Sequence, residues 1–210
     1  MLKDTLTCRI RRFIPAEKIT RNTMDGHSLT QASDDAQWFA LRDLKRANAR
    51  RRAYVDLADR GFDVFTPLKT VVAERAGRRV REERPVIYDL LFVHSTRAAL
   101  DPVVESTDTI QYRFVKGAPA GTVLTVRPTD MQRFITAVNA VSQPRYYSPD
   151  ELTPSMIGHR IRIIGSGPLQ GLEGTLLKIK GSSKKRLLVE LPGLLSAAVE
   201  IAAADFVEVE

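Results

Sequence analysis

The chain has 210 residues, of which 43% are hydrophobic and 27% charged, and its formal net charge is +7. This hydrophobic content is enough for packed cores and excludes wholesale disorder, and the length is typical of one or two domains. The positive balance favours anionic partners, nucleic acid first. No apolar run approaches the roughly 20 residues of a membrane span, so we expect no membrane contact. A single cysteine, Cys8, excludes an internal disulfide and favours a cytoplasmic protein.

The sequence contains no recognisable catalytic or metal-binding constellation. His27, His94 and His159 are far apart, and no histidines and cysteines cluster at the spacing of metal ligands. The glycine-rich run from Gly165 to Pro168 lacks the Gly-Lys-Ser/Thr of a phosphate-binding loop. We therefore expect no enzymatic activity, no metal and no cofactor.

Residues 1–35 form a mixed, polar N-terminal extension that carries several arginines. Two interpretations stay open for it. It is either a partly ordered extension without a function of its own or a basic arm that touches nucleic acid.

Residues 36–141 alternate between strand and helix patterns and predict a first α+β domain. Helices are indicated by apolar residues at three- and four-residue spacing, one ending at Gly61 and one capped by Thr129. A loop with a short helix is expected over 101–109. The expected elements, in chain order, are strands at 38–42 and 62–68, a helix at 47–60, a hairpin of 69–72 and 80–83 with its tip at 76–79, strands at 85–93 and 112–115, and a helix at 129–141.

The remaining residues predict a linker and a small β domain. Three prolines among polar residues indicate an extended, poorly packed linker over 142–155. In residues 156–210, Ile161 and Ile163 alternate with arginines, as in a strand with one buried face. Glycines supply tight turns and close backbone approach in the segment that follows; the turn residues singled out are Gly167, Pro168, Gly171 and Gly174. We expect a stable β-barrel that is loosely tethered.

This last segment resembles the KOW motif, an SH3-like barrel found in ribosomal proteins and NusG-type transcription factors, although another small barrel without a nucleic-acid link is an open alternative. The order of parts across residues 37–210 resembles the NusG family, whose first domain is called NGN. Phe65-Thr66-Pro67-Leu68 matches the family's Phe-x-Pro strand end. The segment from Arg84 to Val93 matches its Arg-Pro-Leu-Phe-Pro-Gly-Tyr-Leu-Phe-Val run, with departures at positions 87–90. The resemblance implies an α+β NGN-like sandwich followed by a KOW barrel.

The resemblance also implies a transcription elongation or antitermination factor that binds the clamp of RNA polymerase and suppresses pausing or termination. In the family, an apolar pocket grips a coiled coil of the polymerase. Carried over, the polymerase-binding residues would be Trp38, Phe39, Ile87, Tyr88, Leu90, Phe92 and Phe114. Ordinary core packing is the alternative role for each of these apolar side chains. The loop at Asp101, Pro102 and Val103 stands where relatives touch the opposite jaw.

Basic clusters suggest further partners of the chain. Closely spaced cations suit phosphate contacts, and in specialised relatives the first helix faces the non-template DNA strand. The candidate nucleic-acid-binding residues are Arg42, Lys45, Arg46, Arg50, Arg51, Arg78 and Arg79; solvated basic surface is the alternative. Rho, RNA or a ribosomal protein are candidate partners of the KOW segment. We expect a monomer.

The departures at positions 87–90 and the N-terminal extension favour a specialised paralogue, similar to the RfaH and UpxY groups that act on specific operons such as surface polysaccharide loci. Two alternatives stay open: a ribosome- or RNA-binding KOW protein, and the general NusG factor.

Overall fold

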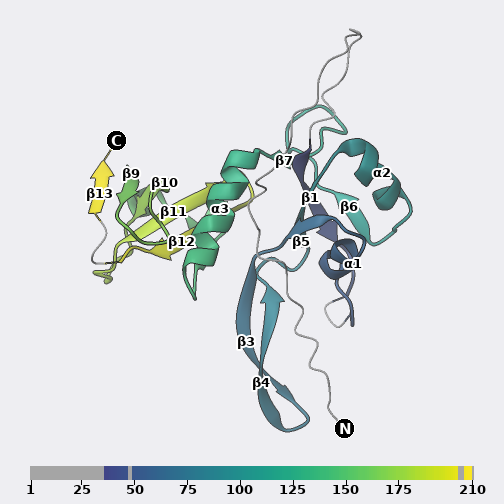
Figure 1. Cartoon of the computed structure of the whole chain (residues 1–210), viewed down its shortest axis with the longest axis horizontal. Coiled ribbons are helices and arrows are strands. Elements are labelled where there is room, and N and C mark those ends of the chain that lie inside the picture. The colour runs from purple at the N-terminus through teal and green to yellow at the C-terminus, as the bar shows by residue number, and fades with distance from the viewer. Residues whose placement is uncertain (1–35, 47–48, 203–205, 210) are drawn as a thin grey trace. The chain divides into compact units, whose positions relative to one another are not determined.

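The computed structural model describes residues 36–46, 49–202 and 206–209 (Figure 1). The expected N-terminal extension over 1–35 lies outside the described residues. The described part is a mixed α/β structure with three sheets and few helices. No helix in it is long and apolar enough to cross a membrane.

A first antiparallel sheet has the strand order β2-β5-β1-β6, with β7 also paired to β1. Its two central strands alternate between faces because successive side chains of a strand point to opposite sides. Trp38, Ala40 and Phe92 lie in one buried cluster, and Phe39 and Leu91 lie in another. The strands are β1 (Gln37–Asp43), β2 (Asp63–Phe65), β5 (Leu90–Ser95), β6 (Ile110–Tyr112) and β7 (Thr125–Val126).

Helices cover both faces of this sheet. Leu57 of α1 and Leu100 of α2 belong to the cluster of Phe39, whereas Phe134 of α3 belongs to the cluster of Trp38. The expected apolar face of the last helix is confirmed, because Met131, Phe134, Ile135 and Val138 are all buried. The helices are α1 (Ala53–Asp59), α2 (Arg97–Glu105) and α3 (Pro128–Ala140).

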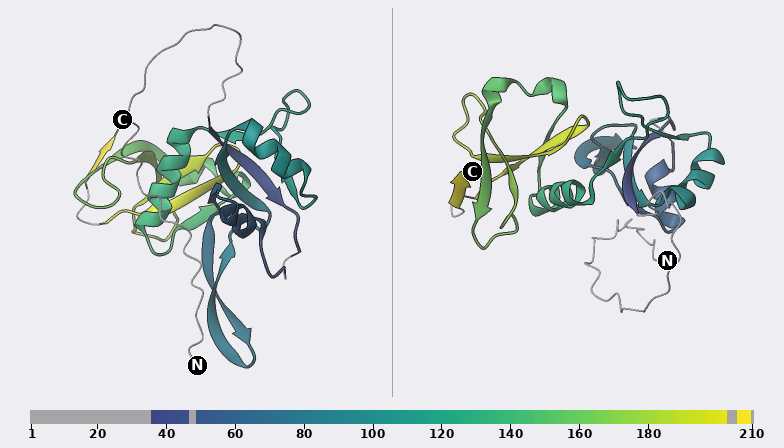
Figure 2. Two further views of the ribbon diagram at one scale, coloured as in Figure 1. Left: turned by 45° about the vertical axis from the view of Figure 1, so that its right-hand side comes forward. Right: turned by 90° about the horizontal axis from the view of Figure 1, so that it is seen from above.

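The expected hairpin is confirmed as a two-stranded ribbon of β3 (Leu68–Arg75) and β4 (Arg78–Pro85). Ala76 and Gly77 form its turn with φ of 51° and 73°, the left-handed backbone of a tight two-residue hairpin turn. In the views of Figures 1 and 2 the ribbon projects away from the first sheet.

The C-terminal residues form a six-stranded antiparallel sheet with the strand order β13-β9-β10-β11-β12-β8. We call it the C-terminal sheet. Ile161 and Ile163 are buried and Arg160 and Arg162 exposed, which confirms the predicted alternation. The strands are β8 (Arg145–Tyr147), β9 (Ile157–Ile164), β10 (Glu173–Leu177), β11 (Arg186–Leu191), β12 (Leu195–Glu200) and β13 (Phe206–Val209).

The segment 142–155 differs from the expected poorly packed linker. Its residues 145–147 form β8, which pairs with β12 in the register Ala197↔Tyr146. Tyr146 also packs against the buried cluster, and burial raises its pKa to about 12. Short 3₁₀ turns follow at Pro149–Glu151 and Pro154–Met156. The proline-rich composition gave no sign of β8, because β12, the strand with which it pairs, lies about fifty residues further along the chain.

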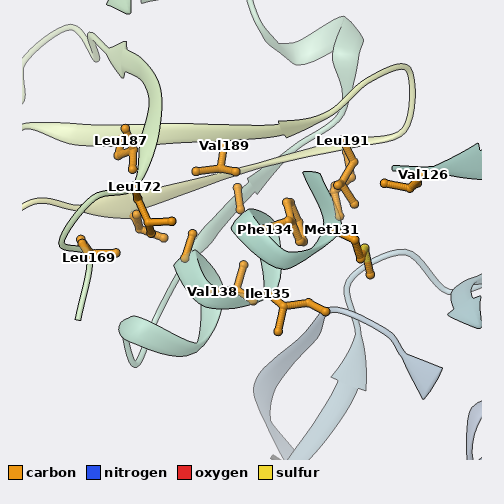
Figure 3. Close-up of a cluster of buried hydrophobic side chains, with 14 of the residues drawn as sticks. Val126, Met131, Phe134, Ile135, Val138, Leu169, Leu172, Leu187, Val189 and Leu191 are labelled. Carbon is orange, nitrogen blue, oxygen red and sulfur yellow. The ribbon is translucent and has the colours of Figure 1, made fainter. Parts of the chain in front are cut away.

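The C-terminal sheet is not loosely tethered to the first domain, contrary to expectation. Helix α3 contacts β11 and β12, and one buried cluster contains Trp38, Phe134 and Leu187. Figure 3 shows the part of this cluster that includes Phe134, Val189 and Leu191. Arg133 of α3 also forms an ion pair with Glu173 of β10 at 3.1 Å. The described residues of both parts lie in one compact unit.

Two predicted elements have different bounds for identifiable reasons. The first helix begins at Ala53 rather than at 47, because the carboxylate of Asp43 accepts the Ala53 N–H at 3.0 Å and Arg52 is extended. The apolar strand begins at Leu90, not 85, because residues 86–89 turn and the Leu90 N–H bonds to the Ile87 carbonyl.

At α3, the residue in the N-cap position is Arg127, with Pro128 as the first helical residue and no side-chain cap. The predicted role of Thr129 as a cap was therefore wrong. Proline at the first position has the φ of a helix and needs no N–H there.

Candidate functional site

Four of the expected polymerase-binding residues are buried in the first domain. Trp38, Leu90 and Phe92 line the face of the first sheet that α3 covers, and their exposed fractions are 7%, 3% and 0%. Phe39 points to the opposite face, among residues of α1 and α2. All four side chains pack in the core of the first domain.

The other three residues reach the surface to different degrees. Phe114 is 57% exposed, Tyr88 is 40% exposed, and Ile87 is half-buried against the α3 side of the core. Phe114 also borders a surface cavity of about 270 Å³. Its other lining residues are Arg42, Gln111, Tyr112 and Arg113. An exposed aromatic side chain beside arginines is suited to a partner that is apolar in part and anionic in part.

Tyr88 is fixed by the basic segment between β1 and α1. The guanidinium of Arg52 lies 4.0 Å from the centre of the Tyr88 ring and donates to the Tyr88 carbonyl at 2.6 Å. The Tyr88 hydroxyl donates to the carbonyl of Lys45. Arg52 Nε is also 3.1 Å from the carboxylate of Asp43, whose side chain is 3% exposed. These contacts therefore hold Lys45 and Arg52 against the turn that precedes β5.

Asp43 anchors the same segment from the end of β1. One carboxylate oxygen accepts the Lys45 N–H at 3.0 Å, and the other accepts the Ala53 N–H that opens α1. A buried carboxylate needs such partners, because an unpaired buried charge is costly. The sequence alone did not predict this role of Asp43. Its only trace in the sequence is an aspartate ten residues before the first residue of α1, which is not a recognised helix-start pattern.

Most basic side chains of the segment are paired with carboxylates. Arg42 bonds to Asp89 at 3.1 Å, and Lys45 and Arg51 both bond to Asp56. Burial alone would raise the pKa of Asp56, but the hydrogen bonds from Lys45 and Arg51 outweigh it and lower that pKa. Arg51 also pairs with Asp59. The charges of Arg42, Lys45 and Arg51 are therefore engaged in ion pairs within the first domain.

Arg46 and Arg50 are the exceptions in this segment. Both are exposed, and within the described part of the chain no ion pair joins either side chain to a carboxylate. Of the five candidate cations here, these two present the most accessible charge to a phosphate.

The expected opposite-jaw loop is a helix. Asp101, Pro102 and Val103 lie in the middle of α2, which Thr96 caps by accepting the Ala99 N–H at 3.2 Å. Asp101 accepts the Tyr112 hydroxyl at 2.6 Å, so it fastens α2 to β6. Burial and this bond raise the pKa of Tyr112. The short helix expected within 101–109 is present, but it begins at Arg97, and Thr96 was a readable start signal for it.

The remaining predicted residues lie at two turns. Arg78 and Arg79 are exposed at the distal end of the ribbon. In the C-terminal sheet, Gly171 has φ of 74°, and a Cβ on Gly174 would lie 2.4 Å from the Leu188 carbonyl oxygen. The carbonyl of Gly167 accepts the Gln170 N–H at 3.0 Å, with Pro168 between them. These residues shape the turn between β9 and β10 and allow close approach of β10 to β11.

The comparison with known families assigns the first domain. A family described as "Transcription termination factor nusG" matches residues 36–135. The match is a similarity of this part of the chain alone. It runs from the start of β1 into α3 and ends before the C-terminal sheet. Among curated proteins, none matches the chain.

The NusG match states what residues 36–135 are similar to. Proteins of this family are transcription factors without enzymatic activity, and they generally bind RNA polymerase. The mixed α/β architecture of the described residues is consistent with a NusG first domain. In the described part of the chain, no three His, Cys, Asp or Glu side chains group so as to hold a metal.

Proposed function

We propose that this chain is a transcription elongation or antitermination factor that docks on the RNA polymerase clamp through residues 36–141 and suppresses pausing or termination. The observation that carries the proposal is the NusG match over residues 36–135. A specialised role at particular operons, such as surface polysaccharide loci, is the finer part of the proposal. It rests on the departures at positions 87–90, where the Tyr88 side chain contacts Arg52 and donates to the Lys45 carbonyl.

The proposed clamp contact centres on Phe114. This side chain is 57% exposed, and Val115 beside it is 37% exposed. A large apolar side chain at the surface, rimmed by polar groups, is typical of a protein-binding site. The buried residues Trp38, Leu90 and Phe92 would support the domain rather than touch the polymerase.

The proposed function is tested by single-round transcription with purified core polymerase on a template that carries one pause site. The full-length protein should shorten the pause half-life at saturating concentration. Unchanged pausing, with the protein shown to be folded, would contradict the proposal. RNA binding without any effect on polymerase would favour the KOW-protein alternative instead.

Arg46 and Arg50 are the proposed contacts to the non-template strand. Reversing both charges should abolish crosslinking to that strand in the transcription bubble, because each cation would otherwise contact a phosphate. Arg60→Glu is a control for a single charge reversal, since Arg60 is exposed at the far end of α1 and lacks an ion pair in the described residues. Equal crosslinking of the double variant and the wild type would contradict a contact of Arg46 and Arg50 with the non-template strand.

The C-terminal sheet is proposed to be a KOW barrel that recruits a second partner, Rho or a ribosomal protein. The glycines that shape its β9–β10 turn support a KOW-type segment. The cytoplasm is the proposed compartment.

A further inference from the structure

The ribbon of β3 and β4 carries its positive charge at one end. Residues 74–81 contain four arginines and one glutamate, which gives a formal charge of +3. The rest of the ribbon, 68–73 and 82–85, contains two cations and two glutamates and sums to zero. A positive end on a projecting element is complementary to a polyanion.

The basal glutamate Glu82 is occupied by local ion pairs. It bonds to Arg75 at 2.7 Å and to Arg84 at 3.0 Å. For Arg78, Arg79 and Arg81, no ion pair to a carboxylate occurs among the described residues, although Glu74 stands opposite Arg79 in register. The arginines that form no ion pair with a carboxylate among the described residues are therefore concentrated at the distal end of β4.

The dimensions of the ribbon fit a groove of double-stranded DNA. Each strand has eight residues, a length of about 27 Å at a rise of about 3.4 Å per residue. The turn at Ala76 and Gly77 contains only two residues, so the end stays as narrow as the two strands. The major groove of B-DNA is about 12 Å wide and admits a two-stranded ribbon.

One face of the ribbon has side chains that can read bases. Val72 is opposite Arg81 and Glu74 is opposite Arg79, so these four share a face. Val72 is 67% exposed, so its side chain is accessible to a partner. Arginine forks pair with guanine, and small apolar groups contact the thymine methyl.

We propose that the distal half of this ribbon enters the major groove of double-stranded DNA, with Val72, Arg79 and Arg81 facing the base edges. The inference deepens the proposed function, since it gives a polymerase-bound factor a duplex-reading element. It does not depend on the polymerase contact, because DNA binding is measurable with the protein alone.

The test compares full-length wild type with Arg79→Ala/Arg81→Ala on a mixed-sequence 30-base-pair DNA duplex, measured by fluorescence anisotropy. The matched control is Lys69→Ala/Arg84→Ala, which removes the same charge from the ribbon base. We expect the distal variant to weaken duplex binding about tenfold or more and the basal variant to weaken it less than about threefold. The melting temperature of each variant verifies folding.

Each alternative outcome overturns the proposal in a recognisable way. Equal losses for both variants would indicate general charge attraction without groove entry. Preference for the single strand of the same length, with the same arginine dependence, would indicate a single-strand site instead. Absence of duplex binding by the wild type would refute the inference, while unchanged polymerase binding by the distal variant would leave the proposed function standing.

Discussion

The Arg52 guanidinium lies 4.0 Å from the centre of the Tyr88 ring, although 36 residues separate the two. The pair joins the basic segment between β1 and α1 to the turn before β5. It gives Tyr88, the most exposed residue of the 87–90 segment, a defined local role.

Tyr88→Phe should lower the free energy of unfolding by about 1 kcal/mol, because it removes the hydroxyl bond to the Lys45 carbonyl and keeps the ring. Tyr88→Ala should cost about 1 kcal/mol more, since the ring contact with Arg52 is also lost. Urea denaturation measures both. Equal stability of Tyr88→Phe and Tyr88→Ala would contradict a role for the ring.

Asp56 should make the first domain sensitive to acid. Its pKa is lowered in the folded protein, so the stabilisation is present above the unfolded pKa of about 3.9 and is lost as pH falls through the folded pKa. The stability difference between wild type and Asp56→Asn should be constant from about pH 7 to about pH 5 and vanish at lower pH.

Urea midpoints collected across this pH range measure the difference. Asp63→Asn is the control, because Asp63 is exposed and forms no ion pair within the described residues. A gap that persists unchanged well below about pH 3 would show that Asp56 acts through packing rather than charge.

Phe134→Ala should destabilise the protein by about 3–5 kcal/mol, the cost of a large cavity in a core. Phe134 is fully buried and contacts Phe65 at 6.2 Å and Tyr146 at 6.5 Å between ring centroids. Gln132→Ala, on the exposed side of the same helix, should cost less than about 1 kcal/mol. In calorimetry of Phe134→Ala, unfolding of the first domain and of the C-terminal sheet should become less cooperative. A single unfolding transition at the wild-type temperature would contradict the shared core.

Gly174→Ala should destabilise the C-terminal sheet by about 1–3 kcal/mol, as overpacking does. The added Cβ would lie 2.4 Å from a backbone oxygen, which cannot move aside as a flexible side chain can. Gly158→Ala is a milder comparison, with the nearest atom at 2.8 Å. Amide hydrogen exchange in β10 and β11 measures the effect, and unchanged protection would contradict the close approach.

Local patterns predicted much of the fold, and long-range contacts account for what they missed. The alternation in β9, the hairpin of the ribbon with its tip within 76–79 and the apolar face of α3 are all properties of neighbouring residues. The start of α1 depends on Asp43, and β8 depends on β12, so neither could be read from adjacent residues. For the candidate site, the sequence indicated which residues were apolar or basic but not that Phe92 is buried, Phe114 exposed and Arg51 already paired.

The central claim, a clamp contact through Phe114, is tested most directly by co-purification of core RNA polymerase with the full-length protein. Full-length protein is needed because α3 packs on the C-terminal sheet. The wild type and the control Val209→Asp, a change at an apolar residue that is 60% exposed, should both retain polymerase. Phe114→Asp should lose it while staying folded. Equal retention by Phe114→Asp would contradict the assigned surface, and no retention by the folded wild type would contradict the polymerase-binding account itself.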